Sequence, residues 1–253
     1  MTPSPAAVRE RPRRGLFRPA LATLAGVAIL TSLGVWQLKR LAWKEALIAQ
    51  ITARAGAPPQ PLPPEAEWAS LDPPSYEYRH VRFAATLEPG REALAFRPAG
   101  GPLRQPGYLS LVPARLASGA VVIVNRGFVP AALKDPATRP EPAPAGPAPI
   151  VGLMRAPEAR NPFTPADAPA KGDFYSRDPA PVAARFGLAR VAPFIVDADR
   201  AAAPAPGVPS GGETEIAFPN NQLSYALTWF GLALALLGVF AAFALRSRAE
   251  PRR

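Results

Sequence analysis

The chain has 253 residues, a formal net charge of +10, 35 prolines, one histidine and no cysteine. The lack of cysteine excludes disulfides, thiolate metal sites and cysteine nucleophiles, and a single histidine excludes a multi-histidine metal site within one chain. So many prolines exclude a long helical bundle and favour short strands joined by loops.

Most of the net positive charge lies at the two ends of the chain. Residues 1–19 hold five arginines and one glutamate, and residues 246–253 hold four arginines and one glutamate. A groove for nucleic acid would instead gather basic residues on a folded surface. Here they flank two apolar segments, where they orient membrane spans. We therefore predict contact with membrane lipid and no nucleic-acid partner.

The first predicted element is a membrane-spanning helix at residues 20–38, a run without charge that has about the length needed to cross a bilayer core. A cleaved signal peptide is the alternative, but its apolar region is usually shorter and ends in small residues. This run ends in bulky and charged residues, from Trp36 to Arg40, which favours an uncleaved anchor. Helix-forming residues with apolar spacing predict that the helix continues over residues 41–55.

The pattern that follows is mostly that of strands, separated by Gly- and Pro-rich turns at spacings typical of an antiparallel sheet or barrel. The predicted strands are His80–Leu87, Ala93–Phe96, Gly107–Val112, Val121–Val124, Ile150–Met154, Pro193–Val196 and Glu213–Phe218. One short helix is predicted at Pro179–Phe186. The stretches Thr138–Pro149 and Ala201–Gly212 are low-complexity loops.

The last predicted element is a second membrane-spanning helix at residues 223–245, which would extend roughly 34 Å. Two spans place both termini on one side of the membrane, and the terminal arginines place that side in the cytoplasm. Lys39, Arg40 and Lys44 oppose this orientation, but the terminal clusters outnumber them.

These elements predict a multi-pass protein of the cell inner membrane. Its fold class is two transmembrane helices that flank a mainly antiparallel β periplasmic domain, α+β and barrel- or sandwich-like. The predicted periplasmic domain covers residues 39–222, and basic cytoplasmic tails cover residues 1–19 and 246–253.

Six short segments occur in a defined order relative to the two predicted spans. They are 34–44 (GVWQLKRLAWK), 78–81 (YRHV), 124–130 (VNRGFVP), 152–155 (GLMR), 161–165 (NPFTP) and 220–230 (NNQLSYALTWF). This ordered combination resembles the Surfeit locus protein 1 family over about residues 26–245. The resemblance implies a non-enzymatic assembly factor for haem-copper cytochrome c oxidase. Such a factor assists haem a insertion into the main catalytic subunit, or stabilises that subunit.

The resemblance also implies partners and a transient ligand. The partners are the main subunit of cytochrome c oxidase and haem a synthase, and the ligand is haem a. The family usually has a histidine where this chain has Gln222, and that histidine is implicated in binding haem a in some bacterial members. Because an amide is a poor iron ligand beside an imidazole, the resemblance supports assembly more strongly than direct haem ligation.

The candidate site residues gather where both spans would meet the periplasmic face of the membrane. Trp36 and Gln37 end the first span, while Gln222, Tyr225 and Trp229 begin the second and share one helical face. If the helices pack, both sets are expected at one depth. They form either an aromatic belt at the headgroups or a platform that holds a porphyrin or docks an oxidase subunit. The two amides favour the platform, since an amide there seeks a partner.

Two residues of the predicted sheet have alternative roles. Arg126 follows an apolar strand, and it either forms a buried ion pair or loop-fixing hydrogen bond, or clamps a propionate or a partner's carboxylate. For His80, on a strand edge, we expect a structural or surface role.

Two rival functions remain open at this point. An enzyme is disfavoured because the sequence shows no His–carboxylate pair, nucleophile elbow, zinc motif or phosphate loop. The other rival is a two-span membrane-anchored ligand-binding or adaptor protein for another respiratory or envelope complex.

Overall fold

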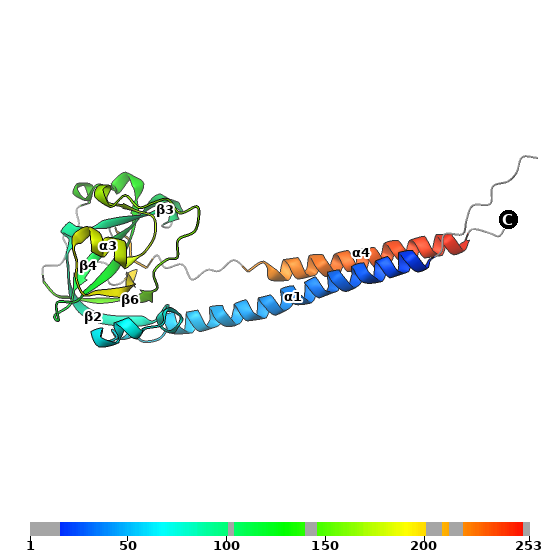
Figure 1. The fold of residues 1–253 in the computed structure, drawn as a ribbon, viewed down its shortest axis with the longest axis horizontal. Coiled ribbons are helices and arrows are strands. Elements are labelled where there is room, and N and C mark those ends of the chain that lie inside the picture. Colours follow the sequence, from blue (N-terminus) through cyan, green and yellow to red (C-terminus); the bar gives the residue numbers. More distant parts are fainter. Residues whose placement is uncertain (1–15, 101–103, 140–145, 201–208, 213–219, 250–253) are drawn as a thin grey trace, which may run out of the picture. The chain divides into compact units, whose positions relative to one another are not determined.

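The computed structural model describes residues 16–100, 104–139, 146–200, 209–212 and 220–249. It divides into two compact units. The first, which we call the helix pair, comprises residues 1–48 and 218–253. The second, the β domain, comprises residues 49–217 (Figure 1).

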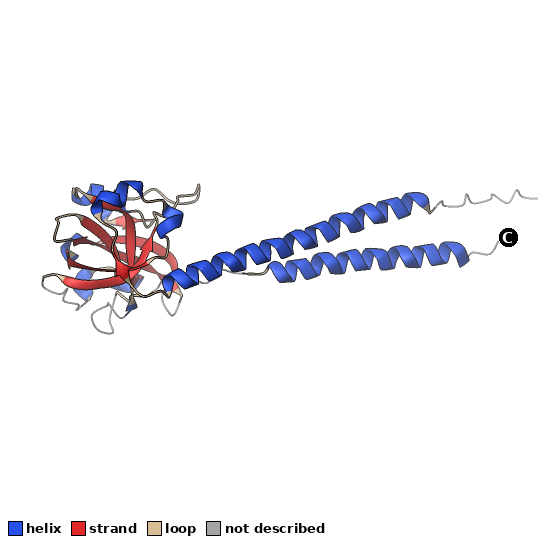
Figure 2. Cartoon of the chain, turned by 90° about the horizontal axis from the view of Figure 1, so that it is seen from below, coloured by secondary structure: helices blue, strands red, loops and turns tan. Residues whose placement is uncertain are grey.

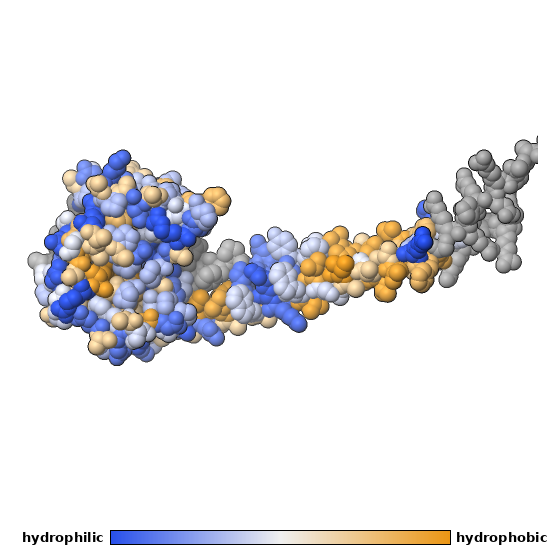
Figure 3. Space-filling view, in the orientation of Figure 1, coloured by the Kyte–Doolittle hydropathy of each residue, from blue (hydrophilic) through white to orange (hydrophobic). Residues whose placement is uncertain are grey.

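The helix pair consists of most of α1 (Phe17–Ala55) together with α4 (Gln222–Ala249). Both helices are long and apolar enough to cross a membrane. Hydrophobic surface covers much of both helices, whereas the visible face of the β domain is mostly polar (Figure 3). The prediction that the first helix continues to Ala55 is confirmed.

The β domain is built on a sheet of eight strands (Figure 2). The strands are β1 (Gln60–Pro61), β2 (His80–Leu87), β3 (Ala93–Gly100), β4 (Gln105–Arg115), β5 (Val121–Pro130), β6 (Ala148–Arg155), β7 (Asp173–Phe174) and β8 (Val191–Ala198). Five of them close into a barrel in the order β2-β6-β8-β5-β4, because β4 also pairs with β2. The predicted fold class is thus confirmed, as a barrel rather than a sandwich.

The barrel contains one parallel pair, and its strand number requires one. Strand directions cannot alternate all the way around a ring with an odd number of members. Four of the five neighbouring pairs are antiparallel, and the β5–β8 pair is parallel. A closed barrel of five strands can therefore be antiparallel at every pair but one.

The alternation of side chains along β5 explains its unbroken apolar run. Val122 and Val124 belong to a core cluster with residues from all five barrel strands, so this cluster fills the barrel. Val121 and Ile123 belong to a second cluster, which includes Val182 of α3 (Pro179–Phe186). Since successive residues of a strand face opposite sides, β5 is buried on both faces and reads as continuously hydrophobic.

Short helices lie in the connections between the strands. They are α2 (Pro73–Tyr76) and the 3-10 helices η1 (Glu65–Ser70), η2 (Pro89–Arg91), η3 (Ala131–Leu133), η4 (Pro136–Thr138) and η5 (Pro169–Lys171). Trp68 of η1 enters the barrel core, where its ring packs edge-on against Phe194 at 5.7 Å. Its indole nitrogen donates to the carbonyl of Pro63 at 2.9 Å, so the buried polar group is satisfied.

The predicted bounds of β2 and α3 are confirmed, and five other strands extend beyond their predicted bounds. The predicted loop 138–149 is wrong at its end, because Ala148 and Pro149 pair with β2. The predicted strand 213–218 lies outside the described residues, as does most of the predicted loop 201–212.

Candidate functional site

The two helices of the helix pair contact each other through small residues. A Cβ added to Gly34 would lie 2.6 Å from the Phe230 ring, and one added to Gly26 would lie 2.7 Å from the side chain of Leu236. Ala226 is buried on the facing side of α4. Small residues let helix backbones approach closely, so this stripe sets where the helices meet.

These contacts place four predicted site residues along the helix axes. Because α1 numbers rise as α4 numbers fall, the helices run antiparallel. Trp36 is two residues from the Gly34–Phe230 contact and Trp229 is one residue from it, so both indoles lie at about the same level. Gln222 lies eight residues from the contact and Gln37 three, which separates the two amides by roughly 7 Å along the axis.

The start of α4 contains two amide oxygens without partners. The side-chain oxygens of Gln222 and Asn220 are buried, and neither has a hydrogen-bond partner within the part of the chain that the structure describes. An unpaired buried acceptor costs about 1–3 kcal/mol. The start of α4 therefore holds two acceptors whose partners do not lie among the described residues. Tyr225, one turn further on, is exposed.

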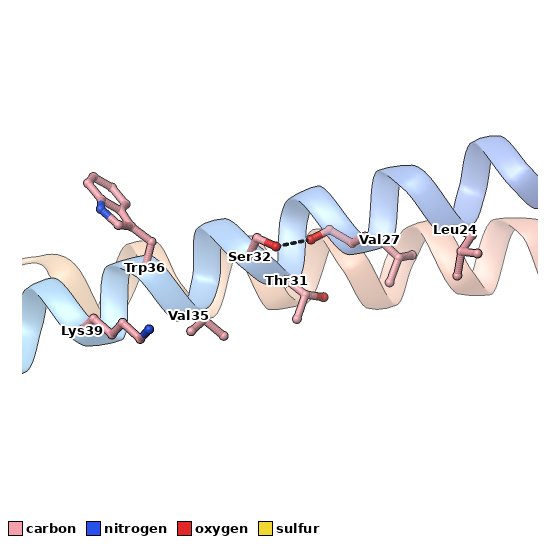
Figure 4. A pocket seen from close by; sticks show the side chains of 8 residues that line it. Leu24, Val27, Thr31, Ser32, Val35, Trp36 and Lys39 are labelled. Atoms are coloured by element: carbon pink, nitrogen blue, oxygen red, sulfur yellow. Dashed lines mark hydrogen bonds between the residues drawn. The ribbon is translucent and has the colours of Figure 1, made fainter.

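The exposed side of α1 has a groove that runs from Leu24 to Lys39 and includes Trp36 (Figure 4). Its volume is about 580 Å³, and its walls are Leu24, Val27, Ala28, Thr31, Ser32, Val35, Trp36 and Lys39. The Ser32 hydroxyl donates to the carbonyl of Ala28 at 2.7 Å, so this polar group is satisfied inside an apolar groove. The Trp36 ring is half exposed, with the Arg40 guanidinium 5.5 Å from its centroid.

Arg126 belongs to the β domain, whereas the other five predicted site residues lie on the helices. It is half-buried on β5. Its neighbour Asn125 donates to Asp197 at 2.8 Å and accepts from the backbone nitrogen of Gly127 at 3.0 Å. Gly127 has a φ of +125°, and a side chain there would collide with the backbone of Ser210. The Asn-Arg-Gly segment is thus held in place by its neighbours on either side of Arg126.

Asp197, at the end of β8, is the centre of a buried polar network. Only 4% of its side chain is exposed, and it accepts from Asn125 on one oxygen. Its other oxygen accepts from Arg155 at 3.0 Å and from Arg177 at 2.9 Å. One carboxylate therefore joins β5, β6, β8 and the loop before α3.

The network continues outward through Arg155. Its Nε donates to Glu77 at 2.9 Å, and its guanidinium lies 4.4 Å from the centroid of the Tyr78 ring. Burial alone would lower the pKa of Arg155, but the charge of Asp197 and the hydrogen bond to Glu77 outweigh burial and raise it. Arg155 therefore stays charged inside the domain.

A second branch runs through Arg177 to Glu158. Glu158 accepts from Arg97 at 2.8 Å and from the backbone nitrogen of Arg177 at 3.2 Å. Burial acts to raise the pKa of Glu158, but the hydrogen bond and charge of Arg97 outweigh burial, so the pKa lies below its usual value. Three cations and three carboxylates thus balance along the chain of contacts from Arg97 to Glu77.

Comparison with known proteins identifies the family. Residues 24–234 match the model of the SURF1 family. The chain belongs to the SURF1 family. Surfeit locus protein 1 of Mus musculus is 34% identical over 216 residues, which cover 80% of this chain and 68% of the mouse protein. The Homo sapiens protein of that name is 32% identical, over 80% of this chain and 70% of its own length.

A SURF1-like protein of Caenorhabditis elegans is also 32% identical, over 81% of this chain and 68% of its own length. SURF1 is a family of assembly factors, and membership implies involvement in cytochrome oxidase assembly.

Three of the SURF1-like segments converge on the Asp197 network. Tyr78, Asn125 and Arg155 come from segments that lie far apart in the chain, and each contacts the network directly. Sequence reasoning missed Asp197 itself, together with Glu77, Glu158 and Arg177. One feature of the sequence could have indicated this network: Asp197 is a charged residue near the end of the apolar strand β8. A buried carboxylate requires cationic partners, so the arginines were the residues to look for.

The single histidine is engaged within the β domain. His80 Nδ1 lies 2.8 Å from the carbonyl oxygen of Ala57, and Nε2 lies 2.9 Å from a carboxylate oxygen of Asp199. The prediction that no His–carboxylate pair exists is therefore wrong. The expectation of a structural role agrees with these contacts, because both ring nitrogens bridge segments distant in the chain.

Haem a, which family resemblance suggests, would find no imidazole among the six candidate site residues, of which only Tyr225 has a side chain of a type that ligates haem iron. The SURF1 chain has one histidine, and both of its ring nitrogens already have oxygen partners. No group of three or more histidine, aspartate or glutamate side chains in the described ranges could hold a metal ion. The platform residues thus do not fit axial imidazole ligation of haem iron.

Proposed function

We propose that this protein is an assembly factor for haem-copper cytochrome c oxidase that binds and stabilises the main catalytic subunit while haem a enters it. The observation that carries the proposal is the SURF1 match over residues 24–234, which includes the whole β domain, most of α1 and the first part of α4. In this proposal haem a is the cargo received by the oxidase, supplied by haem a synthase, and it is not a resident cofactor of the chain.

The contact with the subunit lies at the start of α4. Gln222 and Asn220 have buried amide oxygens that lack donors within the described residues, and a donor from a partner helix would satisfy either oxygen once its side chain turned outward. Trp36 and Trp229 lie near one level of the helix pair, where their rings offer large contact areas with few rotatable bonds. Tyr225 and Gln37 complete this surface.

In this proposal the protein lies in the cell inner membrane, with the β domain in the periplasm. The support for this orientation is the charge distribution, with arginine clusters at both ends of the chain. In that orientation α4 begins at the outer surface of the membrane, directly after the β domain in the chain.

The test is deletion of the gene, followed by oxidase activity and the haem a absorption band in membranes. Both are expected to fall while the oxidase subunits are still synthesised, and the wild-type gene is expected to restore both. Unchanged activity and an unchanged band would contradict the proposal and favour the rival adaptor role in another membrane complex.

A further inference from the structure

Phe163 is the one large hydrophobic side chain that is exposed among the described residues of the β domain, with 93% of its surface accessible. The other exposed large hydrophobic residues all lie on α1 and α4, where lipid covers them in a membrane. A single exposed apolar side chain is not unusual by itself. The decisive observation is how its loop is held.

The turn that presents Phe163 is fixed by hydrogen bonds on both sides. The Asn161 side chain accepts from the Phe163 backbone nitrogen at 2.9 Å, and the Asn161 carbonyl accepts from the Thr164 nitrogen at 2.9 Å. The Thr164 hydroxyl in turn accepts from the Asn161 nitrogen at 3.1 Å. Pro162 occupies the turn position that favours proline. The ring is therefore presented by a preorganised turn.

Arg160 ties the base of the same loop to the domain. Its guanidinium donates to Asp167 at 2.8 Å, to Ser176 at 3.3 Å and to the carbonyl of Pro165. Asp167 also accepts from the backbone nitrogen of Tyr175 at 2.9 Å. The polar groups of the loop form hydrogen bonds within the loop and to the neighbouring segment, and these bonds hold it rigid. Phe163 is the one large apolar side chain that this loop exposes to solvent.

The surroundings of Phe163 fit a protein pocket better than a bilayer. From Arg160 to Ala166, no exposed neighbour of Phe163 is a second large apolar residue, so the ring stands alone. Membrane-binding segments combine several large apolar residues with basic ones, and here the only arginine of the turn is paired with Asp167. A protein pocket can enclose one ring on all sides, as at interface anchors.

We propose that Phe163 is an aromatic anchor that inserts into an apolar pocket on the periplasmic surface of the oxidase's main catalytic subunit. This inference rests on the proposed function and adds to it a second contact, on the β domain. Because the turn is already ordered, little conformational freedom is lost when the ring docks, which favours a transient but specific contact.

Photo-crosslinking of the full-length protein in native membranes tests the contact directly. A photoreactive benzoylphenylalanine at position 163 is expected to form an adduct with the main catalytic subunit, identified by mass spectrometry. The same group at Ala170, an exposed residue of η5, is the matched control and is expected to give an adduct yield at least about tenfold lower. Adducts with lipid alone, with another protein, or equally at both positions would overturn the proposal.

Substitutions separate this proposal from the proposed function. In a deletion strain, Phe163→Ser is expected to restore on the order of tenfold less oxidase than the wild-type gene, whereas Phe163→Leu keeps an apolar anchor and restores most of it. Both variants are expected to unfold at the wild-type temperature, because Phe163 is exposed. Full rescue by Phe163→Ser overturns the anchor while the assembly role stands. An unaffected deletion strain overturns the assembly role instead.

Discussion

At the scale of single residues, Asp197 is the group on which most buried charge depends. It accepts hydrogen bonds from Asn125, Arg155 and Arg177, and only 4% of its side chain is exposed. Asp197→Ala would leave two guanidinium groups without this carboxylate, so we expect a loss of about 3–5 kcal/mol of stability. Thermal unfolding of the full chain in detergent measures the loss.

A surface ion pair is the control for that substitution. Glu65 accepts from Arg190 at 2.6 Å, but this pair is exposed to solvent. Glu65→Ala is therefore expected to change the unfolding temperature little. Equal losses for Asp197→Ala and Glu65→Ala would contradict a special role for the buried network.

Glu158 makes the stability of the network depend on pH. Its pKa in the folded protein lies below the ordinary value of 4.5. The carboxylate therefore contributes stability above that ordinary value, and the contribution is lost as the pH falls through the lower folded pKa. Between pH 6 and about 3, wild-type protein should lose more stability than Glu158→Gln. Parallel stability profiles for the two proteins over this pH range would show that ionised Glu158 does not stabilise the fold.

Gln222 tests whether the platform has lost an iron ligand. The wild-type chain has no imidazole without partners, so the purified protein is expected to retain little haem a. Gln222→His places an imidazole at the start of α4 and is expected to increase haem absorbance after purification. Gln222→Asn, which keeps an amide, is the control. Equal absorbance in both variants would mean that no haem approaches this position.

At the scale of elements, α1 approaches α4 closely at two of its glycines, Gly26 and Gly34. Gly34→Leu places a side chain into the Phe230 ring, whereas a Cβ added to Gly231 meets nothing within 4 Å. We expect Gly34→Leu to separate the helices and lower both thermal stability and oxidase assembly, and Gly231→Leu to be tolerated. Partial rescue of Gly34→Leu by Phe230→Ala would confirm that the steric contact is the cause.

The elements also show what local sequence can and cannot predict. The bounds of β2 and α3 were predictable because turn residues delimit an alternating strand and an Asp178-capped helix. The two-residue strands β1 and β7 were missed, since two residues show no periodicity. The parallel β5–β8 pair was missed because closure of the barrel decides which strands pair, and the sequence of neither strand shows it.

The same limit applies to the site. The aromatic and amide residues at the ends of the helices were visible as a local pattern beside apolar runs. The Asp197 network was not, because its partners lie 20, 42 and 72 residues away in the chain. Its residues come together only when the barrel closes. In any short segment of the sequence they appear as isolated charged residues without a pattern.

At the scale of the whole molecule, the central prediction is that both termini are cytoplasmic and the β domain is periplasmic. The chain has no cysteine, so introduced cysteines can be labelled without background. In intact spheroplasts, a membrane-impermeant maleimide is expected to label Arg190→Cys, an exposed site of the β domain. Ser247→Cys, exposed near the end of α4, is expected to react only after permeabilisation.

The reverse labelling pattern would place the β domain in the cytoplasm. In that case Lys39, Arg40 and Lys44 would act as the positive charges that hold the first helix, in preference to the terminal arginines. Replacing those three residues by glutamine is thus a second test of the same balance of charges. With the predicted orientation, this triple change removes the opposing charge and leaves the labelling pattern intact.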